Sequence, residues 1–165
     1  MKNYKIISIV FFLALYLPFF AFSQELQGKF HDWSVFKIIN QGKAFCYTAS
    51  LPINISGNIQ KTGEAFFLVT KINEDSDEIS SSPGSIISDN SNIELAIGNQ
   101  KYVLFPYQAM LWANNKIDDI NIIKAMQQQA DFNITAVLEN NKSSVYTYSL
   151  IGFKESYSLL KKICK

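Results

Sequence analysis

Few residues in this 165-residue chain have the types and spacing that catalysis needs. The single histidine, His31, is followed directly by Asp32, and neighbouring residues of a strand point to opposite faces, which makes a shared proton difficult. The serines from Ser80 to Ser85 have no histidine–acid partner that would activate a nucleophile. The sequence therefore predicts no catalytic residue and a non-enzymatic protein. The alternative is an enzyme that acts on glycan or peptide through carboxylates and His31.

Metal and cofactor chemistry has one candidate, the acidic run from Glu74 to Glu78. This run lacks the glycine and the distal glutamate of a helical calcium loop, so it predicts a solvated turn. We expect neither a metal-binding nor a cofactor-binding residue, and no cofactor.

Cys46 and Cys164 are the remaining reactive side chains. Two cysteines in an exported chain most often pair, because the compartment is oxidising. Closing so long a loop contributes at most about 4 to 5 kcal/mol in the chain-entropy model. The sequence predicts a Cys46–Cys164 disulfide, and two unpaired thiols are the alternative.

Export is indicated by the first 23 residues. Lys2 and Lys5 precede an apolar run that ends at Ala21-Phe22-Ser23, the pattern of a signal peptide cleaved near Ser23. An uncleaved anchor is the alternative, although the apolar run is short for a bilayer span. Residues 24–165 then form the mature chain of 142 residues, the size of one domain. We expect no membrane span in it.

The charges of the chain limit which partners and which cellular location we expect. The chain carries 15 lysine or arginine residues, all of them lysine, and 14 acids, so the mature part is nearly neutral. Nucleic acid binding needs concentrated positive charge, and we expect none. The absence of arginine indicates an AT-rich bacterial coding sequence. The expected location is the periplasm or the outer membrane, with an envelope or host protein as an unidentified partner.

Most of the mature chain has the alternation of strands. Residues 32–35 and 45–51 alternate, and in the second run Phe45 and Tyr47 share a face while Cys46 lies on the opposite one. We therefore expect the disulfide to lie outside the main core. The near-continuous apolar run 65–72 predicts a strand that is covered on both faces.

Turn-forming residues separate these strands. Residues 52–63 and 80–85 read as irregular loops because they are rich in proline, glycine, asparagine and serine. Gly98-Asn99 between two alternating runs predicts a hairpin of 93–97 with 100–105. A brief strand at 110–113 and a second hairpin, formed by 132–139 and 145–150, follow.

Two segments have helical spacing. In 117–130 the apolar residues Ile120, Ile123, Met126 and Ala130 recur at three and four, behind Asp118 and Asp119 as cap and first-turn acids. From residue 153 onward one face carries Phe153, Tyr157, Leu160 and Cys164. These elements predict a mainly β fold, an immunoglobulin-like antiparallel β-sandwich with two short helices, the last one C-terminal.

Several sequence pieces occur in a familiar order from about Gly28 to Cys164. They are DWSV, KAFCYTASLP, GEAFFLVTK, YVLF, LWA, KAM and TYSLIGF, followed by a helix that ends in Cys164. In this order and spacing the chain resembles the invasion associated locus B family of alphaproteobacterial envelope proteins. The resemblance implies an exported, immunoglobulin-like sandwich without a known catalytic site, associated in some members with entry into host cells. Binding or structural support in the envelope is the expected function, and a small-ligand carrier is a further alternative.

Overall fold

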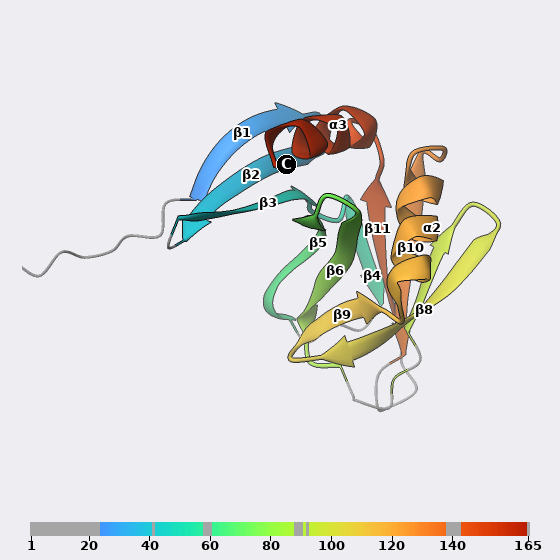
Figure 1. The fold of residues 1–165 in the computed structure, drawn as a ribbon. Coiled ribbons are helices and arrows are strands. Elements are labelled where there is room, and N and C mark those ends of the chain that lie inside the picture. The colour runs from blue at the N-terminus through green and yellow to red at the C-terminus, as the bar shows by residue number, and fades with distance from the viewer. Residues whose placement is uncertain are drawn as a thin grey trace, which may run out of the picture.

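The structure is a computed structural model that describes residues 24–40, 42–57, 61–87, 91, 93–137 and 143–164. The predicted signal segment, residues 1–23, lies outside the described residues, as does Leu138 of the predicted second hairpin. Figure 1 shows a strongly curved sheet with one helix over its first strands and a second helix near its later ones.

The described residues form eleven strands and two helices. In chain order they are β1 (Gln24–Phe30), β2 (Trp33–Asn40), β3 (Lys43–Ser50), β4 (Asn54–Gly57), β5 (Lys61–Asn73), β6 (Ser76–Ser85), β7 (Ile93–Ile97), β8 (Gln100–Tyr107), β9 (Met110–Ala113), α2 (Lys116–Met126), β10 (Asp131–Val137), β11 (Ser143–Ser149) and α3 (Phe153–Ile163).

All eleven strands pair antiparallel in one open sheet, ordered β1-β2-β3-β5-β6-β9-β8-β7-β10-β11-β4. The short β9 joins its two halves, because it pairs with β6 at only Ser80 and Ser81 before β8 continues the sheet. The sheet folds back on itself, so that β5 faces β10 and β11. The predicted mainly β, sandwich-like fold with a C-terminal helix is confirmed, with both layers joined into one sheet.

Aromatic rings fill the space between the two halves. Phe67 of β5 lies with its ring centroid 4.8 Å from that of Phe132 and 5.8 Å from that of Tyr148. Trp33 extends this cluster, since its ring centroid is 4.7 Å from Phe153 of α3 and its Nε1 donates to the Ser149 carbonyl at 2.9 Å. Aromatic pairs at these spacings contribute about 0.5 to 1.5 kcal/mol each beyond their burial. One core therefore connects both sheet halves with α3.

The serine-rich strand β6 corrects one prediction. Residues 80–85 were expected to form a loop, but they pair with β5 and β9. The hydroxyl groups are bonded locally: Ser81 Oγ donates to the Phe66 carbonyl at 2.8 Å and Ser82 Oγ to the Glu64 carbonyl at 3.2 Å. The small serine side chains of β6 therefore allow this strand to lie close to β5. Tertiary pairing overrides the weak strand propensity of serine.

Two further strands were not predicted. Gln24–Phe30 pairs with β2, and Asn54–Gly57, inside the predicted loop 52–63, pairs with β11. Both are the outermost strands of the sheet. Such edge strands depend on one neighbour only, so their own sequences carry little of the alternating pattern.

Helix α2 buries Ile123 and Met126 as predicted, but its buried face is shifted and the helix ends at Met126, before Ala130. Asn115 is its N-cap, and its side chain accepts from the N–H groups of Ile117 and Asp118. Ile120 is exposed and Asp119 is buried, the reverse of the expected arrangement. Asp119 is turned inward because its Oδ1 accepts a hydrogen bond from the backbone N–H of Ile79 on β6 at 2.9 Å.

Candidate binding surface

His31, the residue that the enzymatic alternative would use, lies apart from the two pockets described below. His31 lies exposed in the turn between β1 and β2, with a left-handed backbone at φ 51°. It lines none of the pockets described below. Within the residues that the structure describes, no group of three or more His, Cys, Asp or Glu side chains is arranged to hold a metal ion.

Cys46 and Cys164 are joined in a disulfide, with their Cα atoms 6.1 Å apart and a sequence separation of 118. The bond fastens the end of α3 to β3. The expected position outside the core was wrong, because Cys46 is fully buried while Phe45 on the opposite face is 48% exposed. Helix α3 covers the Cys46 face and makes it an inner surface (Figure 1).

The Cys46 face is buried although it carries polar neighbours. Thr48 is fully buried, and its hydroxyl donates to the Ser34 carbonyl at 3.2 Å. Because that hydroxyl is hydrogen-bonded to the neighbouring strand, it tolerates burial under α3. The predicted alternation of polar and apolar residues along β3 is correct. However, the face with Cys46 and Thr48 points into the protein, and the face with Phe45 points outward. The expected covering of both faces of β5 was also wrong, since Ile72 is 52% exposed.

Two carboxylates, the half-buried Asp77 and the buried Asp119, attach both helices to β6. Asp77 accepts a hydrogen bond from the Tyr157 hydroxyl of α3 and forms an ion pair with Lys71 Nζ at 3.2 Å. Asp119 of α2 accepts from the Ile79 N–H. Burial raises the pKa of Asp119, the Ile79 hydrogen bond opposes this, and nearby acids add to it. The run 74–78 is therefore a structural junction as well as a turn.

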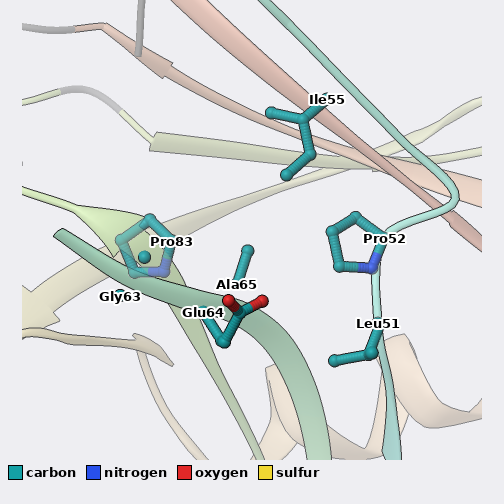
Figure 2. Close-up of a pocket in the computed structure, with 8 residues that line it drawn as sticks. Leu51, Pro52, Ile55, Gly63, Glu64, Ala65 and Pro83 are labelled. Atoms are coloured by element: carbon teal, nitrogen blue, oxygen red, sulfur yellow. The ribbon is translucent and has the colours of Figure 1, made fainter. Parts of the chain in front are cut away.

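A pocket of about 340 Å³ opens where β3 ends and β5 begins. We refer to it as the edge pocket. Figure 2 shows Leu51, Pro52 and Ile55 on one side of it and Gly63, Glu64, Ala65 and Pro83 on the other. Leu51 is 62% exposed and Ile55 40%, so large apolar side chains border open space. Its full lining is Leu51, Pro52, Ile55, Gly63, Glu64, Ala65, Pro83 and Gly84.

The chain path explains why this pocket exists. β3 pairs with β5 only up to Ser50 opposite Phe67, after which the chain leaves the first sheet half. The backbone N–H of Ile53 donates to the Thr147 carbonyl at 2.8 Å, which carries the chain to β4 beside β11. The first part of β5 and the segment 51–55 therefore diverge, and the pocket lies between them.

Glycine shapes the far wall of the pocket. Gly84 has φ 60°, and a Cβ there would lie 2.6 Å from the Gly63 carbonyl oxygen and 2.8 Å from the Ala65 nitrogen. Only glycine allows β6 to approach β5 this closely. A Cβ at Gly63 would meet nothing within 4 Å, so a side chain at that position has room.

The edge pocket combines apolar walls with strand edges. β4 is the last strand of the sheet, paired with β11 on one side only. Open strand edges bind extended peptides through backbone hydrogen bonds, and neighbouring pockets select alternate side chains. The arrangement is suited to an extended polypeptide with an apolar side chain. Sequence reasoning missed this site because the predicted loop at 52–63 gave no sign that residues 51–55 lie beside the start of β5.

Comparison with known proteins supports the fold. No family model matches the chain, and no curated protein matches it. Among solved structures, the crystal structure of invasion associated protein B from Bartonella henselae is similar, with a TM-score of 0.53 at 13% sequence identity. The similarity covers 86% of this chain and 96% of that one. At this identity the similarity shows a shared fold.

Proposed function

We propose that this protein is exported to the bacterial envelope and acts there, without catalysis, by binding an extended segment of another protein in its edge pocket. The observation that carries the proposal is the apolar edge pocket between residues 51–55 and the start of β5, beside β4, an outermost strand of the sheet. The signal-like first 23 residues support export. No helix in the described part of the chain has the length and apolar content to cross a membrane.

The proposal includes membership of the family of invasion associated protein B. The ordered sequence pieces from Gly28 to Cys164 and the fold shared with the Bartonella henselae protein both support it. By this relationship the bound protein belongs to the envelope or to a host cell.

Site-specific photo-crosslinking in the bacterium that makes the protein tests the binding site. A photoreactive residue at Leu51 or Ile55 should give the same discrete adducts, because both side chains border the edge pocket. Val103, which is 53% exposed on β8, is the matched control position and should give none. The substitution Gly63→Trp, which fills open space in the pocket, should abolish the adducts while the fold is kept.

Two results would contradict the proposal. Equal adducts from Val103 would show non-specific proximity, and adducts that persist in Gly63→Trp would place binding elsewhere. Cell fractionation tests the export step separately. The mature protein should begin at Gln24 and be absent from the cytosol.

A further inference from the structure

A second, larger pocket lies at the other end of β5, beside the disulfide. Its volume is about 650 Å³, within the range of small-molecule sites. We refer to it as the lysine pocket. It is lined by Lys37, Lys43, Ala44, Phe45, Thr70, Lys71, Ile72, Asn73, Ile163 and Cys164.

The lysine pocket forms because β3 and β5 stop pairing at Cys46 opposite Lys71. Beyond that pair the β5–β6 register shifts between Lys71 and Asn73, the sign of a bulge that redirects the strand. β3 instead continues beside β2, as far as Lys43 opposite Asn40. The two strands therefore separate and leave a gap, which Ile163 and Cys164 of the C-terminal segment border.

The walls of this pocket are apolar and accessible. Phe45 is 48% and Ile72 52% exposed, although each is large enough to gain from burial. Ile163 is half-buried and packs against the core. Covering the exposed parts of these two side chains would remove apolar surface from water and so favour binding. An apolar ligand chain would supply that cover.

The polar part of the lysine pocket is cationic. Three of the residues that line it are lysines and none is an acid. Lys71 is already paired with Asp77, and Glu25 lies opposite Lys37 in the β1–β2 register. Lys43 is exposed and forms no ion pair with another described residue. The uncompensated charge therefore falls on the Lys43 side, where an anionic group would be attracted.

We propose that the lysine pocket binds a single-chain anionic amphiphile of the fatty-acid class. Its alkyl chain lies between Phe45, Ile72 and Ile163, and its carboxylate lies beside Lys43. This site is separate from the edge pocket, so it goes beyond the proposed function. The combination of apolar walls with Lys43, which forms no ion pair with another described residue, carries the assignment.

Calorimetric titration of the intact disulfide-bonded protein with dodecanoate, below its micelle concentration, tests the proposal. We expect saturable one-to-one binding, weaker binding of the uncharged dodecanol, and weakest binding of the cationic dodecyltrimethylammonium. Lys43→Gln should weaken dodecanoate binding at least threefold and leave dodecanol unchanged. Ile72→Asn should weaken both, at least fivefold.

Matched controls locate the effect. Lys124→Gln, on α2, and Val103→Asn, on β8, remove similar groups outside the lysine pocket and should leave both affinities unchanged. Gly63→Trp, which blocks the edge pocket, should also leave dodecanoate binding intact, so failure of one proposal is distinguishable from failure of the other. Absence of saturable binding, equal affinity for the three amphiphiles, or insensitivity to both Lys43→Gln and Ile72→Asn would overturn the assignment.

Discussion

The hydroxyl group of Tyr157 on α3 donates a hydrogen bond to Asp77 on β6, 80 residues earlier in the chain. The other oxygen of the same carboxylate is 3.2 Å from Lys71 Nζ on β5. One side chain therefore connects α3 with both strands of the β5–β6 hairpin. Burial, together with the hydrogen bond and the charge of Asp77, raises the pKa of Tyr157, which keeps the donor protonated throughout the neutral range.

The substitution Tyr157→Phe should lower the free energy of unfolding by about 1.5 to 3 kcal/mol, because the half-buried, charged Asp77 loses a hydrogen-bond donor. The ring itself, stacked on Phe153 at 5.6 Å, stays in place. Urea denaturation measures the change. Tyr102→Phe is the control, since its hydroxyl bonds an exposed Gln100, and it should change stability by less than about 0.5 kcal/mol. Equal losses in both variants would contradict the role given to Asp77.

The disulfide should be present in the protein as it is isolated from the cell. Intact mass before and after reduction should differ by two hydrogens, and no difference would mean unpaired thiols. The double variant Cys46→Ala with Cys164→Ala should unfold with a free energy about 2 to 5 kcal/mol lower, because the bond closes a long loop. Reductant should lower the stability of the wild-type protein similarly and leave the double variant unchanged.

The sequence predicted strands and helices best where the local pattern and tertiary structure agree. The Gly98-Asn99 hairpin pairs Ile97 with Gln100 as expected, and the Phe153–Cys164 face is the buried side of α3. The sequence-based prediction failed where a strand or face is determined by the element that packs against it. Strand β6 depends on partners on both sides, and the inner side of β3 depends on the position of α3.

The candidate sites were less predictable than the fold. Both pockets lie where β5 diverges from the β3 chain, at its first and last residues. The sequence around Leu51 or Phe45 indicates where β3 ends. It does not indicate where β5 stops pairing with β3, because that depends on the register between the two strands. Pairing of Cys46 with Cys164 was predictable because there are only two cysteines in the chain.

Gly152, the N-cap of α3, has the least room for a side chain among the described glycines. Its φ is 89°, and a Cβ there would lie 2.0 Å from the carbonyl oxygen of Phe30. Gly152→Ala should lower the free energy of unfolding by more than 3 kcal/mol, because backbone strain and a backbone clash add. Gly42→Ala is the matched control: its φ is 76°, but a Cβ would meet nothing within 4 Å, and strain alone should cost about 1 kcal/mol. Thermal unfolding of both variants measures the difference, and similar losses would contradict the close approach of β1 to α3.

Asp119 should make stability depend on pH. Burial raises its pKa above the ordinary value of 3.8, and the charges of Glu78, Asp118 and Asp77 raise it further against the opposing hydrogen bond from Ile79. A carboxyl whose pKa is higher in the folded state binds its proton more tightly there. Its contribution to stability is therefore complete below pH 3.8 and is lost as the pH rises through the folded-state pKa.

Two substitutions separate the charge of Asp119 from its hydrogen bond. Asp119→Asn keeps an acceptor for the Ile79 N–H, so it should be more stable than wild type at pH 7 and flatten the profile above pH 3.8. Asp119→Ala leaves that N–H unsatisfied and should lose about 1 to 3 kcal/mol at pH 7. Urea denaturation from pH 3.5 to 7 measures both, with Asp75→Asn in the exposed β5–β6 turn as the matched control. If Asp119→Asn destabilises the protein as much as Asp119→Ala does, the carboxylate is needed in its charged form, because the hydrogen bond alone would have been kept.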